Sequence, residues 1–450
     1  MGFKKDFVWG TATSSYQIEG AAFEDGRGLS VWDDFCRQPG RVFEGHSGAV
    51  ACDHYHRYRE DTALMADLGI QAYRFSIAWP RIFPEGTGAI NQKGIDFYKR
   101  LAETLLTHNI TPYATLFHWD YPSALLARGG WLNPDSSCWF ADYTHAVANA
   151  LGGLVKNYFT FNEPQCFIGL SYLRTEHAPG IKHSLKDNLA MAHNVLLAHG
   201  KSVQVLRAAV CDCKVGYAPT GSSFYPASNA EKDIEAARTA TFDVNMANWY
   251  FNTAWWSDPV MLGCYPSNGM RELDSILPAI GSNDMAQIHQ PLDFYGQNIY
   301  NSTPVAAHDA QGYCEVPRPV GHAKTAIGWP VTPESLYWAP KFLYERYQTP
   351  ILITENGMSC HDAVSPDGKV HDPNRIDFLH RYLKNLQKAS EEGVDLRGYF
   401  HWSFMDNFEW AKGYDDRFGL VYVDYETQRR IPKDSAYWYS QVIASNGQQL

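Results

Sequence analysis

The sequence has no run of basic residues and no long apolar run, and both absences limit what the protein can bind. Its 450 residues carry a formal net charge of −11. Nucleic acids and anionic membranes are bound through clustered Lys and Arg, so we expect neither as a partner. No stretch approaches the roughly 18 apolar residues of a membrane span, and the opening MGFKKDFVWG lacks the apolar segment of a signal peptide. We therefore expect a soluble, cytoplasmic protein.

The cysteines form neither a disulfide framework nor a zinc-binding pattern. There are nine of them, an odd number, scattered along the chain, and Cys211 and Cys213 do not have zinc-finger spacing. No linker rich in Gly, Ser or Pro divides the chain, and no short repeat is visible. We expect a reducing compartment, no metal, and a single domain over residues 1–450. The high aromatic content, with 14 Trp, 27 Tyr and 23 Phe, is suited to binding the apolar faces of sugars.

Short runs rich in β-branched and aromatic residues recur along the chain, with longer helical patterns between them. Each run has the length of a buried strand. The eight runs begin at Phe7, Ala72, Thr111, Tyr158, Lys214, Asp293, Pro350 and Leu396.

Helical periodicity is readable between several of these runs. Asp53 precedes an apolar stripe that ends before Gly69, and we expect Asp53 to cap that helix; further stripes lie at 95–105 and 378–386. Strand and helix alternating over eight units predict an α/β fold, a (β/α)8 TIM barrel with long loops at the C-terminal face of the strands. An open doubly wound sheet is the competitor, but it would need a Gly-x-Gly-x-x-Gly turn after the first strand, and none is present.

Polar and aromatic side chains follow most of the predicted strands. The C-terminal strand ends of a TIM barrel meet at one pocket, so we expect these residues to lie together, whereas ordinary surface groups would be scattered. They are Gln17, Glu19, Arg74, His118, Trp119, Asn162, Glu163, Asn298, Tyr300, Glu355, Asn356 and Trp402, with Glu409 and Trp410 in the loop after the last strand.

Two glutamates, Glu163 and Glu355, end the fourth and seventh predicted strands. Two carboxyl groups in a pocket of hydroxyl-binding side chains and indoles favour cleavage of a glycosidic bond, with one as the acid and the other facing the positive charge at the anomeric carbon. A separation of about 5–5.5 Å retains configuration, and one of about 6.5–9.5 Å inverts it. The sequence alone leaves this choice open. Taken alone, Glu355 also fits a capping or ion-paired glutamate.

Several long motifs resemble those of glycoside hydrolase family 1. TFNEP and ITENG, around Glu163 and Glu355, look like the acid/base and nucleophile signatures of that family. The chain is identified as a β-glucosidase-like member because the similarity covers nearly all of it. The other similar motifs, in the family's order, are FVWGTATSSYQIEGA, YRFSIAWPRIFPEG, TLFHWDYP, EHAPG and DNFEWAKGYDDRFGLVYVDY.

The resemblance implies a retaining β-glucosidase without a cofactor. Glu355 would be the nucleophile and Glu163 the acid/base, with Arg74 and Tyr300 supporting the nucleophile. The implied substrates are cellobiose, short oligosaccharides and aryl or alkyl β-glucosides, as in cellulose degradation. The residues implied to bind the substrate are Gln17, His118, Trp119, Asn162, Asn298, Trp329, Trp402, Glu409 and Trp410.

Some positions narrow the specificity and others leave it open. Family members that take 6-phosphorylated sugars resemble one another in having a small hydroxyl residue at the position of Glu409. Because this chain has a carboxylate there instead, we expect it to take unphosphorylated glucosides. Glu163 argues against the thioglucosidase branch, which has glutamine there. Gln165 and Ile299 replace a Trp and a Tyr of many relatives and leave the aglycone side open. The alternatives are a β-galactosidase or β-fucosidase, an inactive sugar-binding barrel, and a metal-dependent hydrolase using His118. The assembly state is open, a homo-oligomer included.

Overall fold

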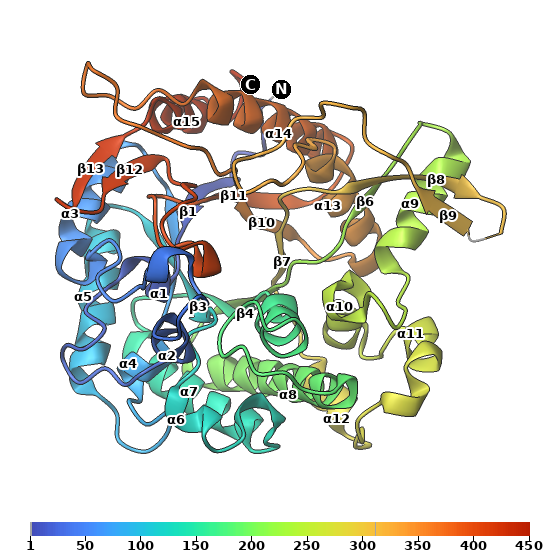
Figure 1. The fold of residues 1–450 in the computed structure, drawn as a ribbon, viewed down its shortest axis with the longest axis horizontal. Coiled ribbons are helices and arrows are strands. Elements are labelled where there is room, and N and C mark those ends of the chain that lie inside the picture. The colour runs from blue at the N-terminus through green and yellow to red at the C-terminus, as the bar shows by residue number, and fades with distance from the viewer. Residues whose placement is uncertain (1, 311) are drawn as a thin grey trace.

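Eight strands pair in parallel and close into a barrel in the computed structural model, which describes residues 2–310 and 312–450. The predicted TIM barrel and all eight of its strands are confirmed (Figure 1). In their order around the barrel the strands are β1 (Val8–Ala12), β11 (Leu396–Trp402), β10 (Ile351–Asn356), β7 (Phe294–Asn298), β5 (Lys214–Ala218), β4 (Asn157–Asn162), β3 (Thr111–Phe117) and β2 (Ala72–Ser76).

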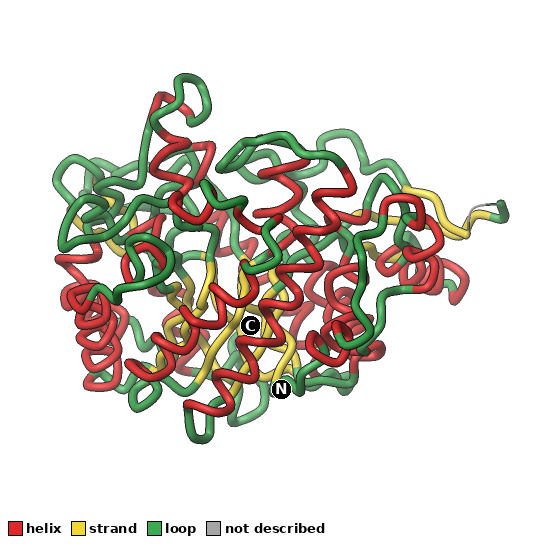
Figure 2. Tube along the Cα trace, turned by 90° about the horizontal axis from the view of Figure 1, so that it is seen from below, coloured by secondary structure: helices red, strands yellow, loops and turns green. Residues whose placement is uncertain are grey.

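Helices surround the barrel, as Figure 2 shows, with the strands in the middle. No helix of residues 2–310 and 312–450 has both the length and the apolar character of a membrane span. The helices are α1 (Ser15–Ile18), α2 (Val31–Cys36), α3 (His54–Asp67), α4 (Trp79–Ile82), α5 (Gln92–Thr107), α6 (Ser123–Leu126), α7 (Ser136–Leu151), α8 (Leu185–Ala209), α9 (Glu231–Phe242), α10 (Thr253–Leu262), α11 (Ser267–Glu272), α12 (Asp284–Ile288), α13 (Ser335–Tyr347), α14 (Pro373–Glu391) and α15 (Asp434–Ala444).

Two small sheets lie in the long connections and were not predicted. A three-stranded sheet is formed by β6 (Phe224–Pro226), β8 (Thr303–His308) and β9 (Gly312–Glu315), and the β8–β9 hairpin protrudes from one side (Figures 1 and 2). The hairpin of β12 (Val421–Asp424) and β13 (Arg429–Pro432) follows the last barrel strand. These strands have three to six residues and are partly exposed, so they lack the buried apolar runs that revealed the barrel.

The prediction that Asp53 caps α3 is wrong. The helix does begin at the next residue, but the capping hydrogen bond is not formed. Asp53 has a left-handed backbone, with φ of 52°, and its side chain accepts no capping hydrogen bond from a backbone N–H of the first helical turn. Its carboxylate instead binds the side chains of His56, at 2.6 Å, and Arg57, at 3.1 Å. The left-handed backbone departs from the extended conformation usual at the N-cap, and the side-chain partners occupy the carboxylate.

The interior of the barrel is filled with side chains from every strand. They form an apolar layer that reaches the C-terminal strand ends, and such a filling is usual for a barrel of this size. The layer consists of Ala12, Ala72, Tyr113, Phe159, Ala218, Phe294, Leu352, Phe400 and Trp402, together with Phe418 from the loop after β11. Arg74 lies over this layer, with its guanidinium carbon 5.0 Å from the ring centroid of Phe159.

Candidate active site

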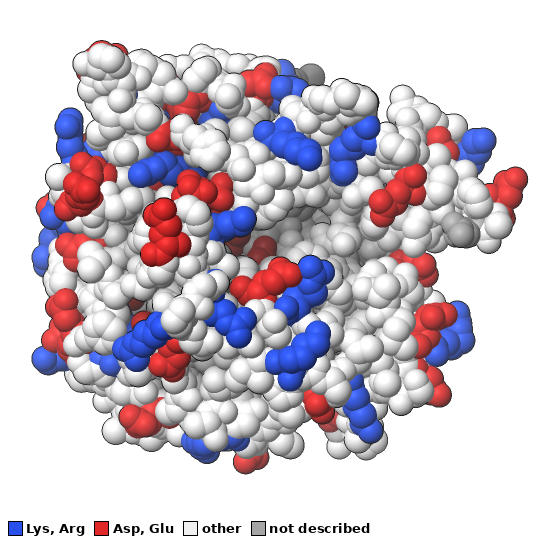
Figure 3. Space-filling view, viewed as in Figure 1, with Lys and Arg blue, Asp and Glu red and all other residues white. Residues whose placement is uncertain are grey.

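A cavity of about 1160 Å³ opens at the C-terminal ends of the barrel strands. Figure 3 shows it as a hollow in the middle of that face, bordered by charges of both signs. The long connections supply much of its outer wall, through residues 40–44, 220–224 and 301–303. The predicted site residues that line the cavity are His118, Trp119, Glu163, Asn298, Tyr300, Trp329, Glu355, Trp402, Glu409 and Trp410.

The end of β10 is irregular, and the irregularity sets the direction of Glu355. The register with β7 shifts between Ile353 and Glu355, and the register with β11 shifts between Ile353 and Asn356. Such bulges re-aim a side chain. Glu355 is 3% exposed, and it accepts hydrogen bonds from Arg74 Nη1 at 2.6 Å and from the Tyr300 hydroxyl at 2.8 Å. Burial raises the pKa of Glu355, and these two donors act in the opposite direction.

Glu163 directly follows β4 and has a left-handed backbone with φ of 45°, which is uncommon for a residue other than glycine. Its N–H donates to the Ala218 carbonyl at 2.9 Å. Its Oε1 accepts from the Asn298 amide at 2.8 Å, and the Cys166 thiol lies 3.3 Å from Oε2. Burial first, and then the charge of Glu355, raise the pKa of Glu163 from 4.5 to about 8. Glu163 is therefore mostly protonated at neutral pH.

A chain of amides joins Arg74 to the cavity wall. Asn162 Oδ1 accepts from Arg74 Nη2 at 2.6 Å and from Asn298 Nδ2 at 3.0 Å, which fixes the orientation of the Asn162 amide. Its Nδ2 must then donate to His118 Nε2, 3.0 Å away. Burial, helped by the Arg74 cation, lowers the pKa of His118 well below its usual range, so the ring is neutral and its proton is on Nδ1. Nδ1 has no hydrogen-bond partner within the described chain.

Aromatic rings form one wall of the site. Trp410 lies 4.5 Å from Trp119 and 5.9 Å from His118 between ring centroids, and Trp402 is 5.6 Å from His118. Trp119 and Trp410 both have left-handed backbones, with φ of 78° and 52°. Together with Glu163, they give three strained residues at one cavity, and such strain persists only where the surroundings enforce it.

Three of the predicted site residues are fully buried and do not line the cavity: Gln17, Arg74 and Asn162. Gln17 Nε2 donates to Asn407 Oδ1 at 2.9 Å and to the Phe408 carbonyl at 2.8 Å, and it lies 3.4 Å from Glu409 Oε2. Gln17 therefore anchors the loop that carries Glu409. Burial raises the pKa of Glu409 well above its usual range.

Gln165, which replaces a tryptophan of many relatives, is fully buried. Its Nε2 donates to the Thr220 carbonyl at 2.8 Å, and the Thr220 N–H donates back to its Oε1 at 3.3 Å. Gln165 thus fixes the backbone of a residue that lines the cavity. Trp329 and Ile299 also line the cavity, and the Trp329 ring centroid is 5.1 Å from that of Tyr300.

The sequence analysis missed Cys166 and Thr354. Cys166 contacts Glu163, and Thr354 donates to Asn298 Oδ1 at 2.6 Å, which orients the amide that binds Glu163. Thr354 had a usable signal, because it is a hydroxyl residue within an otherwise apolar buried strand. Cys166 stands three residues after Glu163, and nothing in its type pointed to the site.

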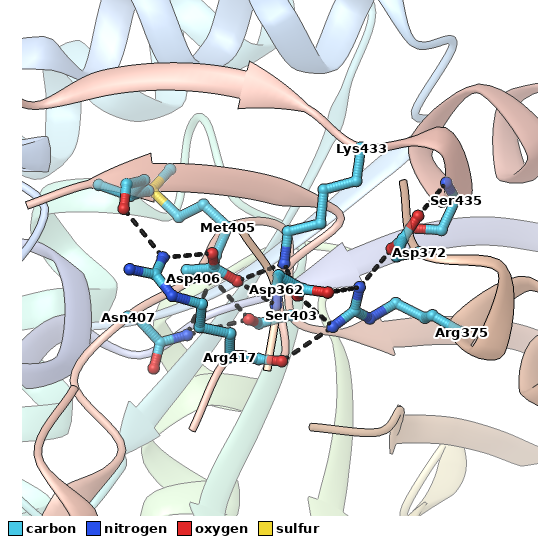
Figure 4. A network of polar contacts seen from close by, with 12 residues as sticks. Asp362, Asp372, Arg375, Ser403, Met405, Asp406, Asn407, Arg417, Lys433 and Ser435 are labelled. Atoms are coloured by element: carbon cyan, nitrogen blue, oxygen red, sulfur yellow. Dashed lines mark hydrogen bonds and ion pairs between the residues drawn. The ribbon is translucent and has the colours of Figure 1, made fainter. Parts of the chain in front are cut away.

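A buried ionic network joins the loop of residues 403–420 to Asp362, Arg375 and Lys433 (Figure 4). Lys433 binds Asp362 at 2.5 Å and Asp406 at 2.6 Å, and Arg417 binds Asp406 at 2.7 Å. Arg375 binds Asp362 at 2.7 Å and also pairs with Asp372. The three cations balance the three carboxylates, so the buried network is electrically neutral. It fixes the loop that carries the cavity residues Glu409 and Trp410.

No group of three or more His, Cys, Asp or Glu residues is arranged to hold a metal ion in the parts of the chain that the structure describes. His401, beside Trp402, is fully buried, and burial lowers its pKa to about 3. Its ring is therefore neutral in the folded protein.

The chain is similar to known glycosidases over nearly its whole length. The sequence model of "Glycosyl hydrolase family 1" matches residues 1–448. Beta-glucosidase A of Thermotoga maritima is 45% identical over 99% of this chain and 98% of its own. The 1,4-beta-D-glucan glucohydrolase of Thermotoga neapolitana is 46% identical over 99% of both chains. The structure of the T. maritima beta-glucosidase in complex with glucoimidazole matches with a TM-score of 0.91, at 45% identity and over 99% of both chains. The chain therefore belongs to glycosyl hydrolase family 1 and is a glycosidase.

Proposed function

We propose that the protein is a retaining β-glucosidase. It removes terminal non-reducing β-D-glucosyl residues from cellobiose, short oligosaccharides and aryl or alkyl β-glucosides. The observation that carries the proposal is the pair of buried glutamates in one cavity with different hydrogen-bond partners. Glu355 accepts from the Arg74 cation and the Tyr300 hydroxyl. Glu163 accepts from the Asn298 amide and the Cys166 thiol. The names of the Thermotoga relatives support glucosides and β-glucans as the substrate class.

The different surroundings of the two glutamates suit two roles. Arg74 and Tyr300 favour the ionised form of Glu355, as a nucleophile requires. Burial and the charge of Glu355 keep the proton on Glu163, as a general acid requires. The Asn298 amide donates to Glu163 and also favours the ionised form of Glu355. Two carboxyl groups served by one amide lie close together, which supports the spacing of about 5–5.5 Å of retaining enzymes.

The reaction then proceeds by double displacement. The Glu355 carboxylate attacks the anomeric carbon while Glu163 gives its proton to the aglycone oxygen, and the aglycone leaves as an alcohol. The glucosyl ester on Glu355 is neutral, so the repulsion that raised the pKa of Glu163 disappears. Glu163, now ionised, takes a proton from water as the water attacks the anomeric carbon. Glucose leaves with its configuration retained.

The remaining residues are proposed to bind the glucosyl unit. The unpaired Nδ1–H of His118 is a donor for a sugar hydroxyl, and Asn162 contributes by orienting the His118 ring through its amide. Asn298 contributes through its orientation of Glu163. Glu409 lines the cavity, and Gln17 contributes by holding the loop that carries it. The indoles of Trp402, Trp410 and Trp119 offer faces for the C–H surface of the ring, and Trp329 lies on the aglycone side.

The buried carboxyl groups of the pocket support an unphosphorylated sugar. Three carboxyl groups, of Glu163, Glu355 and Glu409, line the cavity, and Arg74 is already engaged by Glu355. A sugar phosphate would add about 1.5–2 negative charges to these buried acids. We also propose that residues 1–450 act as one catalytic domain, since the closed barrel joins β1, near the start of the chain, to β11, near its end.

The proposed roles are tested with two variants. Glu355→Gly should lose nearly all hydrolysis of an aryl β-glucoside, and added azide should restore turnover with an α-glucosyl azide as product. A β-azide product would remove Glu355 from the role of nucleophile. Glu163→Ala should slow substrates with poor leaving groups far more than activated aryl glucosides, and equal losses would count against an acid role.

A substrate panel separates the β-glucosidase from its alternatives. Aryl β-glucoside, β-galactoside and β-fucoside should rank with the glucoside first in kcat/KM, and cellobiose should release glucose. A galactoside or fucoside ranking first would reassign the specificity. No hydrolysis of any member by folded protein would indicate a sugar-binding barrel instead.

A further inference from the structure

Cys166 is placed over Glu163 by the backbone that follows β4. A π-helix, η3 (Gln165–Leu173), begins two residues after Glu163. The Cys166 N–H donates to the Glu163 carbonyl at 2.9 Å, which closes a turn around the left-handed Glu163. The same turn brings Cys166 Sγ to 3.3 Å from Glu163 Oε2. Side chain and backbone of Cys166 therefore both bind the same glutamate.

The sulfur of Cys166 is a thiol and not a thiolate. Cys166 lines the cavity but is only 6% exposed. Burial, with the nearby charge of Glu163, raises the pKa of the Cys166 thiol well above its usual range. An S–H group is a weak donor and its sulfur a weak acceptor, so one side chain can meet both protonation states of a carboxyl group.

We propose that Cys166 is a positioning residue for Glu163, whose thiol occupies one lone pair of Oε2 and leaves the other facing the aglycone oxygen. This inference rests on the acid/base role proposed for Glu163. Asn298 marks Oε1 as the accepting oxygen, so the transferable proton is on Oε2, the oxygen beside the thiol. After that proton has moved to the aglycone, the thiol donates to the ionised Oε2. The free lone pair of Oε2 then accepts the proton of the incoming water.

Two substitutions separate this role from simple packing. Cys166→Ala removes the donor to the carboxylate, so the pKa of Glu163 rises. Cys166→Ser replaces the thiol with a stronger donor, so the pKa of Glu163 falls. We expect the alkaline limb of kcat/KM to move up by about half a pH unit in Cys166→Ala and down by a similar amount in Cys166→Ser. A packing role would not move the limb in opposite directions.

The experiment measures kcat/KM from pH 5 to 10 with an alkyl β-glucoside, which needs acid assistance, and with 2,4-dinitrophenyl β-glucoside, which does not. The shifts should appear with the first substrate and be absent from the second. Cys213→Ser is the matched control, because Cys213 is also buried but its thiol faces the Leu206 carbonyl outside the cavity. This control should keep the profile of the unmodified enzyme.

Glu163→Ala distinguishes failure of this inference from failure of the proposed function. In one outcome, Glu163→Ala abolishes the alkaline limb, but the two Cys166 variants leave it in place or move it in the same direction. The positioning role of Cys166 is then wrong, and the acid role of Glu163 stands. If Glu163→Ala keeps the limb, the acid role is wrong, and the inference falls with it. Opposite shifts in Cys166→Ala and Cys166→Ser establish the inference.

Discussion

Replacing Glu163 by glutamine should stabilise the protein, and the gain should grow with pH. The folded protein raises the pKa of Glu163 from 4.5 to about 8 through burial and the charge of Glu355. A carboxyl group whose folded pKa is raised stabilises the fold fully below its unfolded pKa, and this contribution is lost as the pH rises through the folded pKa. Between pH 4.5 and 8 each pH unit therefore removes about 1.4 kcal/mol, which amounts to about 3 kcal/mol at pH 7.

Glutamine in place of Glu163 is neutral at every pH and nearly the same size, so it lacks this dependence. For 450 residues the entropy of unfolding is about 0.9 kcal/mol/K, and a gain of about 3 kcal/mol raises Tm by roughly 3 °C. Differential scanning fluorimetry at pH 5, 6, 7 and 8 measures the difference in Tm from the unmodified protein. It should be smallest at pH 5 and largest at pH 8.

An exposed glutamate supplies the control for this experiment. Glu103 lies on the solvent face of α5, and Glu103→Gln should leave Tm unchanged at all four values of pH. A gain for Glu163→Gln that is equal at pH 5 and pH 8 would refute the reasoning, because it would come from packing and not from ionisation. No gain at any pH would show that the pKa of Glu163 is not raised.

Three further predictions concern Glu355, the ionic network and metal ions. Tyr300→Phe removes a donor to ionised Glu355, so its pKa rises and the acid limb of kcat/KM moves up by about one pH unit; an unmoved limb contradicts this. Lys433→Met leaves Asp362 and Asp406 short of a cation and should lower the free energy of unfolding by about 3–5 kcal/mol, measured by denaturation; a loss below 1 kcal/mol is the contrary result. Prolonged dialysis against a chelator should leave hydrolysis unchanged, and a loss reversed by a divalent metal would show a metal requirement.

The barrel was predictable from sequence because its strands are buried on both faces. Such strands form continuous runs of β-branched and aromatic residues, and those beginning at Ala72 and Thr111 start at the same residues in the structure. The β8–β9 hairpin was not predictable, because its residues alternate irregularly between buried and exposed. The capping of α3 was mispredicted because a side chain suited to a cap found other partners.

The site was predictable as a set of residues but not in its internal contacts. Strand ends of a parallel barrel meet, so Glu163 and Glu355 could be placed in one pocket from their positions alone. Their hydrogen bonds depend on three-dimensional detail, such as the bulge before Glu355 and the turn that brings Cys166 over Glu163. The burial of Gln17 against the Phe408 carbonyl is of the same kind. It joins segments nearly four hundred residues apart, a separation that no local pattern records.

The ionic network around Lys433 couples the loop of residues 403–420 to the C-terminal helix. Lys433 precedes α15 directly, and its side chain joins Asp406 of the loop to Asp362 beyond β10. Undocking of α15 would separate these buried charges, so the loop that carries Glu409 and Trp410 cannot keep its shape without the helix. Amide hydrogens in the two segments should then exchange with the same free energy of opening. A helix on the outside of the barrel thus contributes to the thermal stability of the cavity.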